Sequence, residues 1–303
     1  TAYEISTRDW SSDVCSSDLP SACTHRRFAR TLRRPSRLLS CVTYLDGIVA
    51  WHRKRAATDP RDVATLLEHA AGERATTRRR FADALTRGSS LAVIAEIKRR
   101  SPSKGAIDES LDPVSLADEY ERGGAACLSV LTDGPHFGGS AADLKAARSA
   151  TSLPILRKDF TVCELDIVDA ASMGADAVLL IVAALSDEEL RRFHAVAGHL
   201  SLDALIEVHD EAELERALAI DARLIGVNQR NLHTFAVDQD RAEQMMTQIP
   251  AGVVAVAESG IRGNEDARRL ASAGYRAVLV GEHLVRSTDR GKALRELQVA
   301  LPS

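Results

Sequence analysis

Charged side chains stand at the ends of several short apolar runs in this sequence. Glu96 and Lys98 close the run that begins at residue 91, and Glu207 closes a later one. A charge at the edge of an apolar core is costly unless it is paired, so such residues form either structural ion pairs or a reactive site. Ammonium and carboxylate groups are also side chains that donate and accept protons in catalysis. The sequence therefore presents candidate acids and bases, with a structural ion pair as the alternative at any single run.

Eight runs of this kind recur between residue 91 and the C-terminal region, and each is rich in β-branched residues or Leu. They cover residues 91–97, 126–131, 154–156, 177–182, 204–208, 223–227, 252–257 and 277–280. Amphipathic stretches with apolar residues at helical spacing lie between them, for example residues 186–198 and 211–219. The alternation predicts eight strands separated by helices.

Glycines indicate the length of the repeating unit. Gly124, Gly174 and Gly274 each precede a strand at the point where a helix should stop. Their spacings of 50 and 100 residues suit a unit of about 25 residues, repeated over residues 45–303. The sequence therefore predicts the α/β class and a (β/α)8 TIM barrel with an N-terminal helical extension. A doubly wound sheet is the alternative, but residues 96–100 carry no glycine-rich fingerprint after the first strand.

Reactive groups in such a barrel lie at the carboxyl ends of the strands. Six of the eight predicted strands end in polar residues or glycine, which argues against structural ion pairs as the explanation for the whole set. The run at residues 177–182 is the exception, because the sequence stays apolar as far as Leu185. That stretch suits either plain core packing or a wall against a flat, apolar part of a ligand.

Seven motifs at these strand ends give the sequence a specific resemblance. They are residues 94–105, 131–140, 156–160, 205–209, 226–232, 257–261 and 280–282. In this order and at this spacing, over about residues 45–297, the sequence resembles the indole-3-glycerol phosphate synthase family of tryptophan biosynthesis. Two residues depart from the family pattern. Gln229 stands where Asn or Ala is more usual, and His283 stands where a small residue is common.

The resemblance implies a reaction and divides its steps among residues. The substrate would be 1-(2-carboxyphenylamino)-1-deoxyribulose 5-phosphate, which closes to indole-3-glycerol phosphate with loss of CO2 and water. Lys158 is implied as the lead general acid, with Lys98 as a second acid or a positioning charge. Glu207 is implied as the base. Glu96 would orient Lys98 and bond the substrate hydroxyls, and Asn228 would hold the ring nitrogen or a hydroxyl.

The same resemblance implies the binding residues. Arg230 would pair with the aryl carboxylate, and Glu258 with sugar hydroxyls. The apolar walls around the aromatic ring would come from Phe137, Phe160, Leu179 and Leu232. The phosphate would be held by Ser259, Gly260, Gly281 and Glu282, with Ser101 in a loop that closes over it. No metal site and no organic cofactor are implied.

Composition bounds the wider class of protein. The 303 residues are 45% hydrophobic and carry a formal net charge of -4, which offers no basic field for nucleic acid. The longest apolar stretch, residues 177–185, is far too short for a membrane helix. Five cysteines with no C-x-x-C pair argue against a disulfide framework and structural zinc. We expect a cytoplasmic monomer or weak homo-oligomer that acts on a small phosphosugar, with no nucleic acid and no membrane as partner.

The first 41 residues differ in composition from the rest. They hold seven Arg, no Lys and three of the five Cys, and residues 9–19 resemble the translation of a common sequencing adapter. We expect residues 1–41 to be an artefactual or disordered leader, and residues 42–303 to form a single catalytic barrel. A transit peptide or an RNA-binding arm is the alternative for the leader.

Other functions compete with this interpretation. Another phosphosugar barrel would keep the phosphate loops, but phosphoribosylanthranilate isomerase would be expected to place a Cys and an Asp at the strand ends. A pentose-phosphate epimerase would be expected to place a metal site of His and Asp there, whereas these strand ends carry Lys and Glu. A non-catalytic binding barrel would not need Lys98, Lys158 and Glu207. A nucleic-acid-binding protein does not fit the overall charge.

Overall fold

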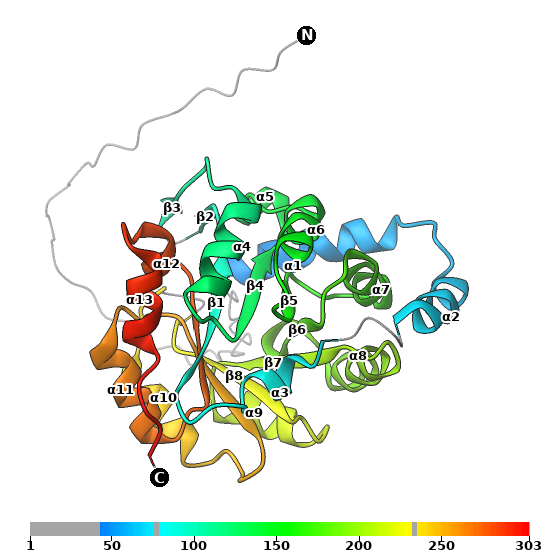
Figure 1. Cartoon of the computed structure of the whole chain (residues 1–303). Helices are drawn as coiled ribbons and strands as arrows, with labels where there is room; N and C mark the ends of the chain where they lie inside the picture. The colour runs from blue at the N-terminus through cyan, green and yellow to red at the C-terminus, as the bar shows by residue number, and fades with distance from the viewer. Residues whose placement is uncertain (1–42, 75–78, 103, 232–234, 303) are drawn as a thin grey trace, which may run out of the picture. The chain divides into compact units, whose positions relative to one another are not determined.

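The computed structural model describes residues 43–74, 79–102, 104–231 and 235–302, and residues 1–41 of the expected leader lie outside these ranges. The main strands are β1 (Ala92–Ile97), β4 (Cys127–Leu131), β5 (Ile155–Lys158), β6 (Ala177–Ile181), β7 (Asp203–Val208), β8 (Leu224–Asn228), β9 (Val254–Glu258) and β10 (Ala277–Val280). They are parallel and close into a barrel in the order β1-β10-β9-β8-β7-β6-β5-β4 (Figure 1). The predicted α/β class and (β/α)8 fold are confirmed.

Helices cover the outside of this barrel (Figure 1). The longer ones are α4 (Pro113–Arg122), α6 (Ala141–Ala150), α7 (Glu164–Met173), α8 (Asp187–His199), α9 (Glu211–Leu218), α10 (Gln239–Met246), α11 (Asn264–Ala273) and α13 (Arg290–Leu297). Shorter pieces are α3 (Phe81–Ala84), α5 (Gly134–Phe137), the 3-10 turn η1 (Val182–Ala184), α12 (Glu282–Arg286) and a hairpin of β2 (Arg100–Ser101) and β3 (Gly105–Ala106). The N-terminal helical extension is also confirmed, as α1 (Tyr44–Ala57) and α2 (Val63–Arg74). None of the described helices combines the length and apolar character needed to cross a membrane.

Each predicted apolar run coincides with one strand, but three strands continue beyond their run. β5 ends at Lys158, β8 at Asn228 and β9 at Glu258. The ladder includes these residues, since Leu131 lies opposite Lys158 and Asn228 opposite Glu258. A polar residue can stay in the strand here because its backbone remains in the ladder while its side chain lines an open cavity. Apolar patterning therefore underestimates the strands at the end that matters for chemistry.

Local sequence explains where several helices begin and end. α8 begins at a capping box, in which the Ser186 side chain accepts from the Glu189 N–H and the Glu189 carboxylate accepts from the Ser186 N–H. α7 and α11 end at Gly174 and Gly274, whose φ angles of 88° and 112° lie in the left-handed region. Glycine adopts this backbone most easily, so the predicted glycine stops have a steric cause.

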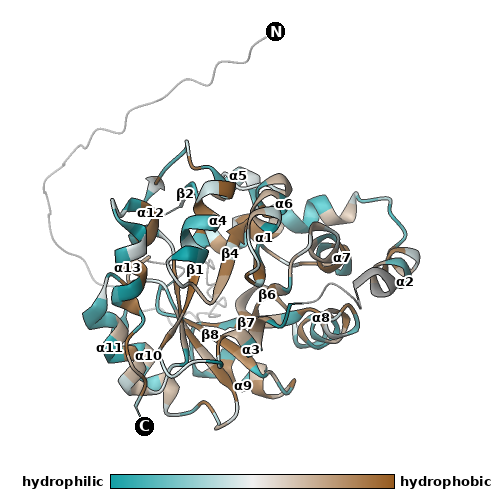
Figure 2. Ribbon diagram, in the orientation of Figure 1, coloured by the Kyte–Doolittle hydropathy of each residue, from teal (hydrophilic) through white to brown (hydrophobic). Residues whose placement is uncertain are grey.

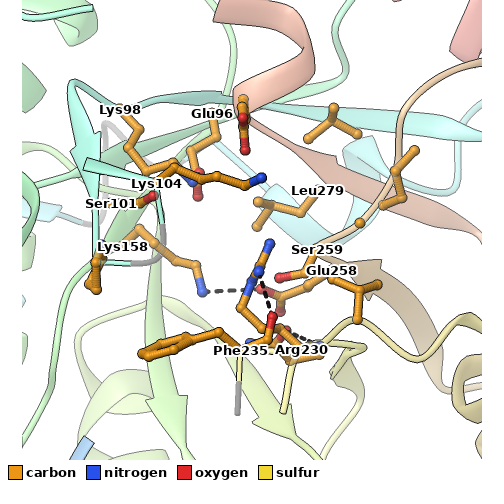
Figure 3. Close-up of a pocket in the computed structure, with 18 of the residues that line it drawn as sticks. Glu96, Lys98, Ser101, Lys104, Lys158, Arg230, Phe235, Glu258, Ser259 and Leu279 are labelled. Carbon is orange, nitrogen blue, oxygen red and sulfur yellow. Dashed lines mark hydrogen bonds and ion pairs between the residues drawn. The ribbon is translucent and has the colours of Figure 1, made fainter. Parts of the chain in front are cut away.

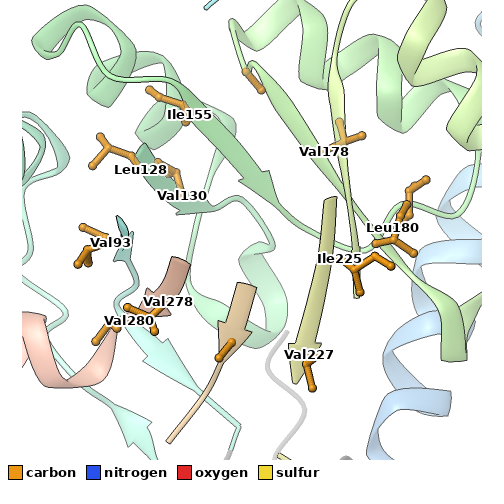
Figure 4. Close-up of a cluster of buried hydrophobic side chains, with 14 of the residues drawn as sticks. Val93, Leu128, Val130, Ile155, Val178, Leu180, Ile225, Val227, Val278 and Val280 are labelled. Atoms are coloured by element: carbon orange, nitrogen blue, oxygen red, sulfur yellow. The ribbon is translucent and has the colours of Figure 1, made fainter. Parts of the chain in front are cut away.

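Alternation along the strands separates two hydrophobic clusters. One set, which includes Val93, Val130 and Leu180, packs with the apolar faces of the helices (Figure 4). The alternate set, which includes Ile94 and Leu156, fills the barrel interior together with Phe81 of α3. Figure 2 shows the result, with apolar strands at the centre and polar residues on the outer helix faces. The barrel is therefore a packed core that leaves open space only beyond its interior layers.

This alternation decides which residues reach the open end of the barrel. Residues two apart share a face of a strand. Glu96 lies two residues beyond the interior side chain of Ile94, and Glu207 lies two residues beyond Leu205. Lys158 follows the same rule on β5. The charged strand ends therefore continue the interior stack and meet above it.

α1 closes one side of this open end. Its Arg55 pairs with the buried Asp166 at the start of α7. The buried His52 lies on the same helix, with Nε2 3.3 Å from Asp133 Oδ2. Ile48, one turn earlier, is buried and lines the cavity described below. The N-terminal extension thus contributes to the site as well as to the fold.

Candidate active site

A cavity of about 1200 Å³ opens at the carboxyl ends of the strands (Figure 3). It is lined by every predicted site residue that the structure describes. These are Glu96, Lys98, Ser101, Phe137, Lys158, Phe160, Leu179, Glu207, Asn228, Arg230, Glu258, Ser259, Gly260, Gly281 and Glu282. Leu232 lies outside the described residues. The structure brings these residues to one place, and their individual roles remain predictions.

The Lys158 ammonium lies between two carboxylates. Its Nζ is 2.6 Å from Glu207 Oε2 and 3.1 Å from Glu258 Oε2. Burial disfavours the charged amine, but Glu207, Glu258 and Glu96 together hold the pKa of Lys158 well above its usual range. Lys158 is therefore an ammonium at neutral pH, in direct contact with two groups that could receive or return its proton.

Glu207 is surrounded by donors. Besides Lys158, its partners are Asn228, whose Nδ2 donates to Oε1 at 3.1 Å, and the ring of His209. Burial works against the carboxylate, but the Lys158 ammonium and the His209 ring outweigh it and hold the pKa of Glu207 well below its usual range. The carboxylate is therefore fixed in orientation and ready to accept a proton.

His209 is a partner of Glu207 that the sequence analysis did not include among the site residues. Its Nε2 lies 3.3 Å from Glu207 Oε1, and its Nδ1 lies 2.9 Å from Glu213 Oε2. Burial disfavours the imidazolium, but these two carboxylates raise the pKa of His209 to about 10. The His209 ring is thus a cation in contact with the carboxylate of Glu207. The spacing in the sequence could have indicated this contact. His209 is two residues beyond Glu207, and residues two apart lie on the same side of an extended chain.

Glu258 differs from Glu207 although both touch the same ammonium. Burial and the negative charge of Glu207 raise the pKa of Glu258 to about 7, against the opposing effect of Lys158. Its Oε1 is buried and has no hydrogen-bond partner within the described part of the chain. Glu258 is therefore the carboxyl of the pair that is more easily protonated, and its unpartnered Oε1 lies buried against β8.

Gly226 on β8 provides the space for Glu258. A Cβ at this position would lie 2.1 Å from Glu258 Oε1. We therefore expect Gly226→Ala to displace the carboxyl and lower kcat/KM by about tenfold or more, since small misplacements at a site are costly. Overpacking should also lower the free energy of unfolding by about 1–3 kcal/mol. Steady-state kinetics and urea unfolding measure the two effects.

Gly198 is the matched control for this change. It lies in α8, and a Cβ there would meet nothing within 4 Å. Gly198→Ala should leave kcat/KM unchanged and stabilise the helix by about 0.5–1 kcal/mol. Equal kinetics for the Gly226→Ala and Gly198→Ala proteins would contradict the steric role of Gly226.

Lys98 and Glu96 form a second ion pair at the mouth of the cavity. The Lys98 ammonium contacts Glu96 Oε1, and both side chains are largely buried. Gly281, just after β10, leaves room for the pair, since a Cβ there would lie 2.4 Å from Glu96 Oε1. The expected orientation of Lys98 by Glu96 fits this contact. Figure 3 shows Lys98 and Glu96 on the same side of the cavity as Lys104 and Ser101.

Aromatic rings line the wall of the cavity beyond β4 and β5. The ring centroids of Phe137 and Phe160 are 6.2 Å apart, and the ring of His52 packs 5.2 Å from that of Phe160. His52 was not predicted, because α1 is remote in sequence from the strand ends. Together with His136, it surrounds the buried Asp133, whose Oδ2 is 2.8 Å from His136 Nδ1. Hydrogen bonds therefore account for the cluster of His52, Asp133 and His136, which fixes α1 against this wall.

The loop after β9 has an unusual backbone. Ser259 and Gly260 both have positive φ angles, 68° and 74°. This conformation is costly for a residue other than glycine, and such strain is concentrated at functional sites. Gly260 adopts such a φ readily, so the unfavourable backbone at this predicted phosphate loop is that of Ser259.

Arg230 brings a guanidinium group to the cavity. Its Nη1 donates to Phe235 O at 2.9 Å, and its backbone N–H donates to Asn228 Oδ1 at 3.0 Å. Figure 3 shows Arg230 beside Phe235, across the cavity from Lys104. Within the described ranges, Phe235 O is the acceptor for one of its five guanidinium donors, which leaves others for a ligand carboxylate.

Comparisons with known proteins agree on one family. A family model described as indole-3-glycerol phosphate synthase matches residues 45–297. An indole-3-glycerol phosphate synthase of Beutenbergia cavernae is 46% identical over 262 residues, which cover 86% of this chain and 96% of that one. One from Nocardioides sp. is 53% identical over 211 residues, 70% of this chain and 81% of that one. One from Desulfotalea psychrophila is 44% identical over 253 residues, 84% and 97% respectively.

A solved structure supports the fold alone. Thiamine phosphate pyrophosphorylase from Pyrococcus furiosus matches with a TM-score of 0.51 and 18% sequence identity. The match covers 68% of this chain and 93% of that chain. At this level of identity the match supports a similar fold and says nothing about the reaction.

Proposed function

The chain belongs to the indole-3-glycerol phosphate synthase family, and from this premise we propose how its residues divide the work of the reaction. An indole-3-glycerol phosphate synthase closes 1-(2-carboxyphenylamino)-1-deoxyribulose 5-phosphate to indole-3-glycerol phosphate, a step of tryptophan biosynthesis. It is a carboxy-lyase, because the aryl carboxylate leaves as CO2. The observation that carries our assignment is the Lys158 ammonium held between Glu207 and Glu258 in one cavity.

Ring closure needs an acid at the ketone of the substrate. The aryl carbon that bears the carboxylate forms a bond to the carbonyl carbon while Lys158 gives a proton to the carbonyl oxygen. Loss of CO2 then returns its electron pair to the ring and restores aromaticity. Lys98, paired with Glu96, acts as a second donor or as a positioning charge for the hydroxyls.

Dehydration needs an acid and a base. The new hydroxyl takes a second proton and leaves as water, while Glu207 removes a proton from the neighbouring ring carbon to form the indole. Because Glu207 is 2.6 Å from Lys158, it can return that proton to the amine directly. The other proton comes from solvent, since an anionic carboxylate leaves as neutral CO2. Asn228 keeps Glu207 oriented and holds the ring nitrogen or a hydroxyl.

Binding of the substrate divides between an aryl end and a phosphate end. Arg230 pairs with the aryl carboxylate through its planar set of donors. Phe137, Phe160 and Leu179 provide apolar surface for the ring. At the other end, Glu258 accepts from the sugar hydroxyls. The phosphate binds in the loops after β9 and β10, at Ser259, Gly260, Gly281 and Glu282, with Ser101 and Lys104 beside them.

Inorganic phosphate should compete with the substrate at the phosphate end. Backbone amides recognise the anion regardless of the sugar attached, so competition is expected at roughly tens of millimolar, as for so small a ligand. Gly260→Asp should raise KM by about tenfold or more, because a carboxylate beside the phosphate repels it. Inhibition kinetics measure both effects.

Gly260→Ala is the matched control for the charge. A Cβ at this position would lie 2.3 Å from Cγ1 of Val237, a side chain that is 38% exposed and can move. Both substitutions share that steric effect and the strain of a positive φ, so the excess effect of Asp over Ala is electrostatic. An absence of phosphate inhibition, or equal KM values for the two variants, would count against this location of the phosphate.

The whole assignment is tested by incubating the full chain with the carboxyphenylamino-deoxyribulose phosphate. Indole fluorescence should appear, and CO2 should be released in equal amount. Failure to form indole-3-glycerol phosphate from this substrate would contradict the proposed function.

We further propose that the protein acts in the cytoplasm as a monomer or weak homo-oligomer, with no nucleic acid as partner. Its net charge of -4 and the absence of a C-x-x-C pair in the sequence support this proposal. We also propose that residues 42–303 are the catalytic domain, supported by the family match over residues 45–297.

A further inference from the structure

Gln229, immediately after β8, is buried beneath the loop that follows β9. Only 2% of its surface is exposed, and it is not among the residues that line the cavity. Its side-chain Nε2 donates to Ser259 O at 2.9 Å, and its backbone N–H donates to Glu258 O at 3.0 Å. Gln229 therefore fixes two successive carbonyl groups of that loop from behind.

Gln239, the first residue of α10, holds the next carbonyl. Its Nε2 lies 3.4 Å from Gly260 O and donates to Asp266 Oδ1 at 2.8 Å. The other oxygen of Asp266 accepts from the backbone N–H of Arg262 at 2.8 Å. The carbonyl groups of Glu258, Ser259 and Gly260 thus accept hydrogen bonds from Gln229 or Gln239.

Because the peptide unit is planar, a hydrogen bond that fixes a carbonyl group also fixes the direction of the next N–H group. In a planar trans peptide, the C=O of one residue and the N–H of the next point in opposite directions. The anchored carbonyls of Glu258, Ser259 and Gly260 therefore direct the N–H groups of Ser259, Gly260 and Ile261 away from the two glutamines. These last three residues line the cavity. Gln229 does not line the cavity, so the amides that point away from it point to the cavity side, where an anion can bind; Gln239 is itself a lining residue.

We propose that Gln229 and Gln239 are positioning residues that hold the amides of Ser259, Gly260 and Ile261 toward the substrate phosphate. This inference rests on the proposed function, which puts the phosphate in this loop. It also gives Gln229 a role in binding, although Gln229 does not line the cavity.

The backbone of the loop explains why anchors are needed. Ser259 has a φ of 68°, which is unfavourable for a residue with a Cβ. The next residue is Gly260, which accepts many φ values, so the peptide between them can rotate at little steric cost. A rotated peptide would present a carbonyl oxygen to the phosphate in place of an N–H. The hydrogen bond from Gln229 to Ser259 O opposes that rotation.

The test is Gln229→Met, which keeps the length of the side chain and removes its donor. We expect KM and the inhibition constant of inorganic phosphate to rise together by about fivefold to tenfold, the loss expected when one hydrogen bond to an anion is weakened. We expect kcat to change by less than about threefold, because the reacting atoms are not touched. Gln239→Leu should act in the same direction, and it changes only a half-buried position.

The substrate without its phosphate, 1-(2-carboxyphenylamino)-1-deoxyribulose, separates positioning from general damage. Wild type and Gln229→Met should turn it over with equal kcat/KM, since it cannot use the loop. Gln244→Met is the matched control, because Gln244 is exposed on the same α10 helix as Gln239. It should leave KM and phosphate inhibition unchanged.

Three outcomes would overturn the inference. The first is an unchanged inhibition constant of inorganic phosphate in a folded Gln229→Met protein. The second is an equal loss of kcat/KM by Gln229→Met with the substrate that lacks its phosphate. If Gln229→Met does not fold, an unaltered inhibition constant in Gln239→Leu is the third. Failure of the proposed function is distinct, because the wild-type protein itself would then make no indole-3-glycerol phosphate.

Discussion

Lys158→Ala lowers kcat by about 10²-fold or more, the loss typical of removing a general acid. The amine is held as an ammonium by Glu207 and Glu258, whose carboxylate oxygens lie 2.6 Å and 3.1 Å from Nζ. Single-turnover formation of indole-3-glycerol phosphate, followed by fluorescence, separates this chemical step from product release.

Three other substitutions provide comparisons for the effect of Lys158→Ala. Lys145→Ala, on the exposed face of α6, should change nothing. Arg230→Ala should act mainly on KM, because its partner carboxylate is present before the transition state. Lys98→Ala should fall between Arg230→Ala and Lys158→Ala in its effect on kcat. If Lys158→Ala retained near-normal turnover while Lys98→Ala abolished it, the acid would lie on β1 instead of β5.

Glu207→Gln should also lower kcat by about 10²-fold, with little change in the free energy of unfolding, because the amide keeps the shape and removes the base. Glu211→Gln is the matched control, since Glu211 is exposed at the start of α9. Normal turnover by Glu207→Gln would show that another group removes the proton. Glu258, with a pKa of about 7 and an unpartnered oxygen, would then be the first alternative.

The pH dependence follows from the same contacts. In the unliganded protein the pKa of Lys158 is raised and that of Glu207 is lowered, so both are in the required state across the neutral range. Activity should fall in acid as Glu207 takes up a proton and in alkali as Lys158 loses one. The apparent pKa values of the two limbs of this pH profile belong to the coupled pair and to neither residue alone. In Glu207→Gln, the charge that raises the pKa of Lys158 is gone. The alkaline limb should therefore move to lower pH, and an unmoved limb would contradict the coupling.

The sequence was sufficient to predict the barrel because its signals are local. Apolar runs mark strands, and glycines such as Gly174 and Gly274 mark helix ends, since each depends on the backbone and side chains of a few neighbouring residues. Closure into a parallel barrel then follows from the regular alternation. The same alternation brings the ends of the strands to one face, so the cavity and the residues that line it from the strand ends were predictable.

The contacts within that cavity were not predictable from local patterns. Lys158 lies 49 residues from Glu207 and 100 residues from Glu258 along the chain, and only the register of the closed barrel makes them neighbours. For the same reason His52 of α1 was missed, because helix docking brings it to the aromatic wall. Gln229 could be noted as unusual in the sequence, but its partner Ser259 became visible only in the folded loop.

What the sequence by itself determined is therefore the set of strands and helices, the barrel, and which residue types reach its open end. The tertiary structure decided which charges pair, and with that the direction in which each pKa is shifted. Glu207 and Glu258 are the same residue type at equivalent strand ends, yet the pKa of Glu207 is lowered and that of Glu258 is raised. The difference arises because a pKa depends on burial and on charges within a few ångströms, and these distances exist only once the barrel has closed.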